Sequence, residues 1–142
     1  MSLEYFLAKL TKQGGRDYNE DSLMFDVDRG IYVVADGLGG HGGGGEASRI
    51  AVNSLTELLR DANFGAATLQ DSILKTNELI LTHQQSETHL ANMSTTLVVL
   101  WIRDDQALWG HIGDYRLYLF FKGKLITQTK DHSVPQALVQ AG

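Results

Sequence analysis

The chain has 142 residues, of which 43% are hydrophobic, and a formal net charge of -5 at pH 7. This length suits one domain, residues 1–142, with a core of its own, and the acidic balance argues against partners such as nucleic acid or an anionic membrane. Because there is no cysteine and no apolar run near the ~20 residues that span a bilayer, we expect a cytoplasmic protein without disulfides, thiolate metal sites or a thiol nucleophile.

The first part of the chain predicts three strands. Residues 4–11 alternate in character and indicate a first strand, and residues 22–27 resume an extended pattern. Asp28-Arg29-Gly30 is typical of a hairpin turn into the next strand. That strand, residues 31–35, has five apolar residues in a row, which favours burial on both faces.

A glycine-rich loop then leads into two predicted helices. Apolar residues at helical spacing indicate a first helix over residues 47–61 and a second over residues 68–89. Thr68 with Asp71 resembles a capping box at the start of the second helix.

The period changes again after Ser94, where the pattern predicts strands. Four are expected, over residues 95–102, 107–112, 116–121 and 124–127. Their short connections require antiparallel neighbours. Trp101 and Trp109 are expected in the core, and Pro135 suits the first turn of a last helix. Strands and helices are therefore segregated along the chain, which is typical of an α+β fold.

Several acids are predicted to meet at one end of the first hairpin. Asp36 ends a buried strand, where a carboxylate is costly unless a cation compensates it. Glu20 and Asp21 precede the partner strand, and Asp114 begins a later one. Mg2+ and Mn2+ prefer several oxygen ligands, to which the carbonyl of Gly37 would add one. Asp21 and Asp114, each taken alone, are equally compatible with capping a turn.

Arginine and histidine supply further candidates for chemistry. Arg16 could bind a phosphate oxygen bidentately, although a lone exposed arginine is usually just solvated. His41 lies in the glycine loop and could act as a general acid near neutral pH. His132 is expected to hold its turn through hydrogen bonds, and His111 to be structural.

A dinucleotide-binding loop is an alternative interpretation of the glycines. Residues 37–42, GLGGHG, fit the G-x-G-x-x-G pattern between a strand and a helix. Three features oppose it. Asp36 would repel the pyrophosphate, Asp61 closes a helix instead of a second strand, and no parallel strand is expected to follow.

Five motifs in order resemble the metal-dependent protein phosphatases, the PPM or type 2C family, and especially its bacterial serine/threonine phosphatases. The motifs are Arg16-x-x-Asn19-Glu20-Asp21, Ala35-Asp36-Gly37-Leu38-Gly39-Gly40-His41 with Gly45-Glu46, Ser94-Thr95-Thr96, Gly113-Asp114-Tyr115-Arg116 and Thr129-x-Asp131-His132-Ser133. Together they cover most of the chain.

The resemblance implies an antiparallel β-sandwich flanked by helices, with two Mn2+ or Mg2+ ions at one end of the sheets. Asp36 would bridge both metals, while Glu20 and the carbonyl of Gly37 would complete the second. Asp114 is similar to the aspartate that helps to hold a third, weaker metal. Arg16 would hold the phosphate of a phosphoserine or phosphothreonine protein, and water activated by the metals would attack phosphorus without a phosphoenzyme.

The chain also departs from the family pattern. Met93 stands where the family usually has glycine, Tyr115 replaces a serine, and His41 is displaced along its loop. Family members continue beyond the Asp-His-Ser segment into further strands and two more aspartate motifs, which this sequence lacks. We therefore expect a domain truncated at its C-terminus, with weak metal binding and low activity.

Two further expectations follow. A phosphatase-like module that binds a partner or phosphopeptide without catalysis remains the alternative function. A sandwich without its final strands would expose strand edges and apolar surface, so we expect self-association.

Overall fold

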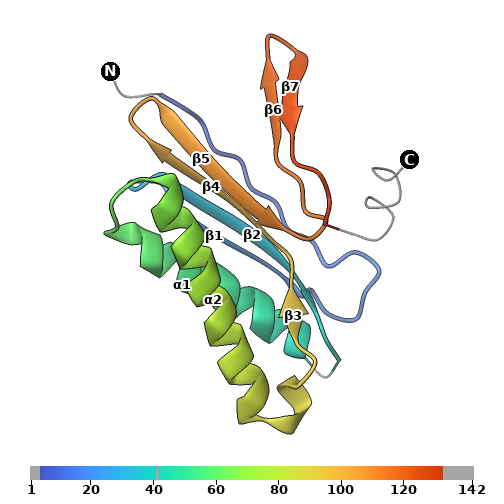
Figure 1. Ribbon diagram of the computed structural model, residues 1–142. Coiled ribbons are helices and arrows are strands. Elements are labelled where there is room, and N and C mark those ends of the chain that lie inside the picture. The colour runs from blue at the N-terminus through green and yellow to red at the C-terminus, as the bar shows by residue number, and fades with distance from the viewer. Residues whose placement is uncertain (1–3, 41, 133–142) are drawn as a thin grey trace, which may run out of the picture.

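The computed structural model describes residues 4–40 and 42–132, and Figure 1 shows helices on one side of a central sheet and a separate hairpin on the other. The central sheet has the strand order β1-β2-β4-β5, with β3 paired to β2, and β6 and β7 form their own sheet. The elements are β1 (Asp21–Asp26), β2 (Ile31–Leu38), α1 (Gly43–Arg60), α2 (Ala66–Ser86), the 3-10 helix η1 (Thr88–Leu90), β3 (Ser94–Thr95), β4 (Leu97–Arg103), β5 (Gln106–Ile112), β6 (Tyr118–Phe121) and β7 (Lys124–Gln128).

All strand pairs in the described residues are antiparallel, which confirms the predicted α+β class. No parallel strand follows α1 in that part of the chain, so the dinucleotide-binding interpretation is wrong. Neither of the two long described helices is apolar enough to cross a bilayer.

The β1–β2 hairpin forms where the sequence predicted it. Gly30 has a φ of 67°, and its amide donates to the carbonyl of Val27 over 3.2 Å. The register from this turn pairs Asp26 with Ile31 at one end and Asp21 with Asp36 at the other. Two carboxylates therefore stand side by side at the open end of the hairpin.

The core lies between β2, β4 and α1. Strand β2 turns alternate residues toward the helix, and β4 adds the fully buried side chain of Trp101, as predicted. The buried apolar side chains include Ile31, Val33, Ala35, Ala47, Ala51, Leu55, Leu59, Leu97 and Val99. Helix α1 begins four residues earlier than expected, because Gly43 and Gly44 are buried where it packs on the end of β2.

The predicted first strand is wrong. Residues 4–11 are exposed and belong to no ladder. The segment is instead attached through side chains, since the Tyr5 hydroxyl donates to the carbonyl of Val27 over 3.3 Å and the Tyr5 ring packs edge-on against Tyr32. Alternation alone cannot distinguish a paired strand from an extended segment that lies on a sheet.

The chain leaves the central sheet after β5, so the expected pairing of β5 with β6 is also wrong. Gly113 turns the chain with a φ of 92°. Arg116 then makes two hydrogen bonds of 2.7 Å to the carboxylate of Asp131, and Leu117 exchanges hydrogen bonds with Thr129. These contacts join the two ends of the β6–β7 hairpin, and in the described residues β6 pairs with β7 and not with β5.

Three smaller expectations have different outcomes. Trp109 is 42% exposed and lies outside the core. Helix α2 starts at Ala66 after Gly65 without a side-chain cap, so Thr68 and Asp71 form no capping box. The helix expected at Pro135 lies outside the described residues.

Candidate active site

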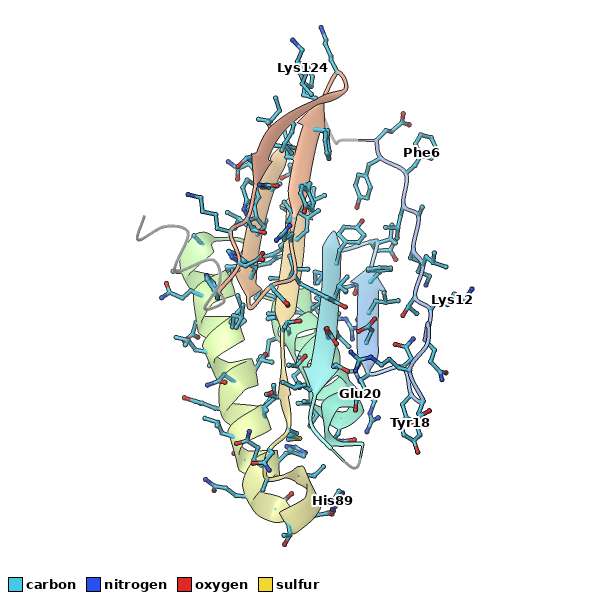
Figure 2. All side chains as sticks on the ribbon, turned by 90° about the vertical axis from the view of Figure 1, so that its right-hand side faces the viewer. Phe6, Lys12, Tyr18, Glu20, His89 and Lys124 are labelled. Atoms are coloured by element: carbon cyan, nitrogen blue, oxygen red, sulfur yellow. The ribbon has the colours of Figure 1, made fainter. Side chains whose placement is uncertain are left out.

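A polar cavity of about 620 Å3 lies at the end of the β1–β2 hairpin. Figure 2 labels three of its residues, Lys12, Tyr18 and Glu20, and shows Tyr18 and Glu20 near that end. Its walls come from the segment before β1 and the first residue of β1, the end of β2, the glycine loop, the residue between β3 and β4, and the turn after β5. The lining residues are Lys12, Gln13, Arg16, Asp17, Tyr18, Asn19, Glu20, Asp21, Asp36, Gly37, Leu38, Gly39, Gly40, Gly42, Thr96 and Asp114.

The cavity gathers most of the candidates that were far apart in the sequence. Arg16, Glu20, Asp36, Gly37 and Asp114 all line it. His41 lies outside the described residues, so its proposed role as a general acid remains a prediction.

Asp36 is positioned by hydrogen bonds from β3 and from Thr96, the residue between β3 and β4. Its amide donates to Oγ1 of Thr96 over 3.1 Å, and its carbonyl accepts from the amide of Thr96 over 2.9 Å. Oγ1 of Thr95 donates to the same carbonyl over 3.0 Å. The Ser94-Thr95-Thr96 motif thus fixes the backbone that carries Asp36.

Glu20 is held against the start of α1. Its carbonyl accepts hydrogen bonds from the Gly37 amide over 3.1 Å and from Oγ of Ser48 over 2.6 Å. A Cβ on Gly44 would lie 2.8 Å from both Cδ and Oε1 of Glu20. The carboxylate therefore packs on the bare backbone of a helix N-terminus, where the helix dipole favours negative charge.

The close packing of acidic side chains raises pKa values in the cavity. Burial raises the pKa of Asp36, and hydrogen bonding with Asp21 and the charges of Asp21, Asp114 and Glu20 raise it further. Burial likewise raises the pKa of Tyr115, with Asp21 as the next cause. Each shift means that added negative charge is disfavoured here. A divalent cation would relieve that cost.

The oxygen ligands in the cavity supply only part of the coordination that a hard divalent cation requires. Two carboxylates, Asp36 and Glu20, and the Gly37 carbonyl offer the oxygen ligands that Mn2+ and Mg2+ prefer. Among the described residues, however, no group of three or more acids or histidines is arranged to hold one ion by itself. The residues fit a metal site that draws further ligands from water or from elsewhere.

Cations line the same cavity as the acids. Lys12 and Arg16 come from the exposed segment before β1, and Nε2 of Gln13 donates to the Arg16 carbonyl over 2.6 Å. In the part of the chain that the structure describes, the Arg16 guanidinium forms no salt bridge. It is therefore available to a phosphate.

The turn beside Asp114 is held by histidines. The amide of His132 donates to the Gly113 carbonyl over 2.7 Å, which confirms the predicted role of His132 in its turn. The rings of His111 and His132 stack with centroids 4.4 Å apart, and Nε2 of His111 lies 2.7 Å from the Lys130 carbonyl oxygen. Both histidines act structurally here, as expected.

Sequence reasoning missed several positioning residues. The roles of Thr96 and Ser48 are hydrogen bonds to the backbones of Asp36 and Glu20. Thr96 belongs to a quoted motif and could have been proposed, whereas Ser48 and Gly44 give no signal until the helix is seen packed on β2. Lys12 likewise joins the cavity only through the path of an irregular segment.

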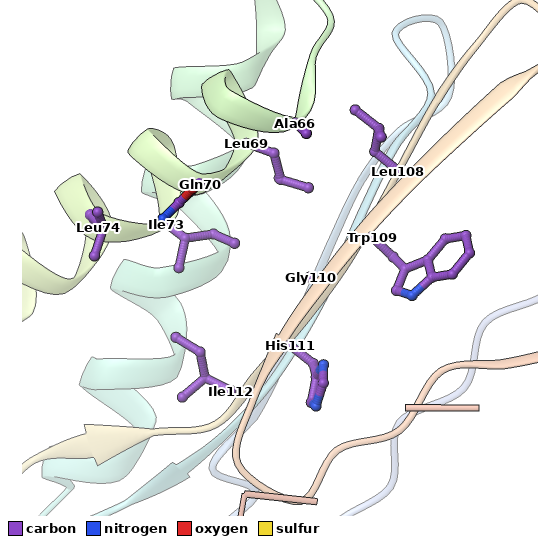
Figure 3. Close-up of a pocket in the computed structure, with 10 residues that line it drawn as sticks. All are labelled: Ala66, Leu69, Gln70, Ile73, Leu74, Leu108, Trp109, Gly110, His111 and Ile112. Atoms are coloured by element: carbon purple, nitrogen blue, oxygen red, sulfur yellow. The ribbon is translucent and has the colours of Figure 1, made fainter. Parts of the chain in front are cut away.

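A second pocket, of about 250 Å3, lies between α2 and β5 and is mainly apolar (Figure 3). Its walls include Leu69, Ile73, Leu108 and Ile112. It carries none of the acids or cations described above, so the polar cavity is the candidate active site.

Comparison with known proteins agrees with this geometry. The protein phosphatase 2C family model matches residues 13–133. The serine/threonine phosphatase stp of Listeria monocytogenes serotype 4b is 34% identical over 136 residues, which cover 89% of this chain and 54% of that protein. The serine/threonine protein phosphatase PstP of Mycobacterium tuberculosis is 34% identical over 129 residues, 89% of this chain and 25% of PstP.

Solved structures give the same answer at the level of the fold. The crystal structure of M. tuberculosis PstP/Ppp superposes with a TM-score of 0.81 at 35% identity, covering 89% of this chain and 54% of that one. The catalytic domain of PstP in complex with two manganese ions gives a TM-score of 0.80 at 35% identity, covering 89% and 55%. This chain spans about half the length of these solved domains and of the Listeria relative. By sequence and by fold, it belongs to the protein phosphatase 2C family.

Proposed function

We propose that the protein hydrolyses phosphoserine and phosphothreonine in phosphorylated proteins, with Mn2+ or Mg2+ as cofactor. The observation that carries this proposal is that Arg16 lines the same cavity as Glu20, Asp36 and Asp114. Cations for a phosphate and hard oxygen ligands for metals are the two requirements of metal-assisted phosphate hydrolysis. The named activity of the relatives supports the same reaction.

Each side chain has a distinct proposed task. Asp36 and Glu20, with the Gly37 carbonyl, would hold the metal pair, and Asp114 would contribute to a weaker third ion. When bound, the metals activate a water molecule for attack on phosphorus. Arg16 orients the phosphate through its planar guanidinium. The manganese-bound relative supports the choice of metal.

The test is hydrolysis of a phosphothreonine peptide under single-turnover conditions, with the chain in excess so that slow chemistry is measurable. We expect phosphate release that depends on Mn2+, is lost in Asp36→Asn and is lowered in Arg16→Ala. Asp105→Asn changes an exposed acid in the β4–β5 turn and serves as the matched control. Release that persists in Asp36→Asn would reject the proposal.

A non-catalytic module is the competing function. Calorimetric titration with Mn2+ separates the two, since an enzyme of this type should bind at least two ions and a binding module few or none. Peptide binding through Arg16 without hydrolysis at any Mn2+ concentration would favour the module.

We also propose that the chain alone self-associates through the β6–β7 hairpin. Its apolar side chains are between 45% and 63% exposed, namely Tyr118, Leu119, Phe120, Phe121, Leu125 and Ile126. Such a patch marks an interaction surface. A monomeric mass in light scattering at high concentration would count against this. The cytoplasmic location stays a prediction.

A further inference from the structure

Two exposed apolar side chains stand among the polar residues that line the candidate active site. Leu38 is 72% exposed and Tyr18 is 75% exposed, and both line the cavity. A single exposed apolar side chain is ordinary on a protein surface. Two of them at the edge of one polar cavity form a small apolar surface, which we call the apolar rim.

Leu38 lies on the same face of β2 as Asp36. Side chains alternate along a strand, so these two residues share a face and are separated by about 7 Å along the strand. The backbone of Leu38 is held by β3, because the register pairs Leu38 with Ser94. The apolar side chain therefore has a fixed place near the carboxylate that is proposed to bind the metals.

Tyr18, the second residue of the apolar rim, comes from the segment before β1. The Gly37 amide donates to the Glu20 carbonyl over 3.1 Å, which continues the antiparallel register of the hairpin one residue beyond β1. One step further, the same register sets Leu38 opposite Asn19, the residue that follows Tyr18. The two residues of the apolar rim are therefore neighbours at the open end of the hairpin, near which Figure 2 labels Tyr18.

Hydrogen bonds of Asn19 hold the backbone next to Tyr18. Nδ2 of Asn19 donates to Oγ1 of Thr11 over 3.0 Å, and Oδ1 of Asn19 accepts from the amide of Asp21 over 3.1 Å. These bonds close the loop that also carries Arg16, the residue proposed to bind the phosphate. A ligand that meets a backbone already held in place pays less conformational entropy on binding.

The cavity is larger than a phosphate group requires. Its volume is about 620 Å3, whereas a cavity needs only ~15 Å3 to hold one water molecule, and a phosphate group is a few times larger than water. Part of a peptide therefore has room beside the phosphate. Consecutive α-carbons of a peptide are about 3.8 Å apart, so a residue next to the phosphorylated one lies within reach of the apolar rim.

We propose that Leu38 and Tyr18 recognise an apolar side chain directly beside the phosphorylated residue of the substrate. The substrate class is then a phosphoserine or phosphothreonine protein with leucine or a similar residue next to the phosphate. An apolar side chain there removes its own surface and that of the apolar rim from water, whereas a polar one gains nothing from the contact. This inference rests on the proposed function, in which Arg16 and the metals hold the phosphate.

The experiment measures the binding of two peptides to the full 142-residue chain in the presence of Mn2+. Both peptides carry the phosphonate analogue of phosphothreonine, which is not hydrolysed, and they differ only in having leucine or serine on either side of it. We expect fluorescence anisotropy to show about fivefold tighter binding of the leucine peptide, which corresponds to partial burial of one leucine side chain. Equal affinities would overturn the proposal.

Substitutions in the apolar rim should remove this preference. In Leu38→Ser and in Tyr18→Ser we expect the ratio of the two affinities to fall toward one. Both side chains are mostly exposed, so neither variant leaves a hole in the core, and circular dichroism would verify the fold. Leu74→Ser and Phe6→Ser remove exposed apolar side chains that do not line the cavity, and as matched controls they should keep the ratio. A preference that survives both substitutions in the apolar rim would overturn the proposal.

Failure of this inference is distinct from failure of the proposed function. A preference for the leucine peptide without hydrolysis of the corresponding phosphothreonine peptide would reject the function and support the role of the apolar rim. Hydrolysis with equal affinities for the two peptides would overturn the role of the apolar rim alone. An oligomer of the chain that Leu38→Ser converts to a monomer would assign the apolar rim to a contact between copies and would also overturn the proposal.

Discussion

The carboxylate of Glu20 lies directly against the α-carbon of Gly44, the second residue of α1. The same α-carbon approaches the backbone of Gly37, so the end of β2 and the start of α1 meet without side chains between them. This contact fixes Glu20 relative to Asp36, because Gly37 follows Asp36 directly in β2.

Gly44→Ala should therefore separate α1 from β2. A Cβ there would press on both the Glu20 carboxylate and the Gly37 backbone, and we expect a loss of about 1–3 kcal/mol of unfolding free energy, as for overpacking in general. The neighbouring Gly45 has open space at its Cβ position, so Gly45→Ala should stabilise the helix by about 0.5–1 kcal/mol. Urea unfolding measures both, and equal effects at the two positions would contradict this packing.

Asp36→Asn should raise the stability of the metal-free chain at neutral pH. Burial and neighbouring acids disfavour the charged form of Asp36, as its raised pKa indicates, and the amide removes that charge at almost constant shape. The same change should abolish stabilisation by Mn2+. Thermal unfolding with a chelator measures the stability of the metal-free chain, and thermal unfolding with Mn2+ measures the stabilisation by the metal. Asp105→Asn is the control for both. A variant that is less stable without metal would contradict the prediction.

Thr96→Val should loosen the backbone of Asp36. The substitution keeps the shape of the side chain but leaves the partly buried Asp36 amide without its acceptor, at a cost of about 1–3 kcal/mol. Thr96→Ser retains the hydroxyl and serves as the control, losing one methyl group worth about 0.8 kcal/mol at most. Hydrogen exchange of the Asp36 amide should accelerate in Thr96→Val alone. Similar exchange in both variants would show that Oγ1 does not hold this amide.

The sequence predicted correctly those parts of the fold that depend on residues close together in the chain. The Asp28-Arg29-Gly30 turn and the apolar run after it were enough to predict that Glu20 and Asp36 lie at the same end of the hairpin. The register confirms this, because it pairs Asp21, the residue after Glu20, with Asp36. Residues 4–11 and the link from β5 to β6 were mispredicted, because both depend on distant partners. For β6 the decisive contact is Arg116 with Asp131, fifteen residues apart. The packing of Gly44 on Glu20 likewise exists only once the helix has docked.

The Arg116–Asp131 pair should make stability depend on pH in the acidic range. Hydrogen bonds from Arg116, and then the charges of Arg116, His111 and His132, lower the pKa of Asp131 below its usual 3.8. A carboxyl group with a lowered folded-state pKa contributes stability above its unfolded-state pKa and loses it as pH falls through the folded-state value. The melting temperature of the wild type should therefore exceed that of Asp131→Asn at pH 6, and the gap should narrow progressively as the pH falls below about 4.

Asp71→Asn provides the control for this prediction. Asp71 pairs with Lys75 over 3.1 Å on the exposed surface of α2, with both side chains more than half exposed. Exposed pairs of this kind contribute little, on the order of 0.3–0.5 kcal/mol, so the melting temperature should change little at any pH. Asp131 differs because its side chain is only 13% exposed and accepts two short hydrogen bonds from one guanidinium. A wild-type advantage over Asp131→Asn that stays constant down to pH 3 would show that the pair is not what ties the β6–β7 hairpin to the Asp131–His132 segment.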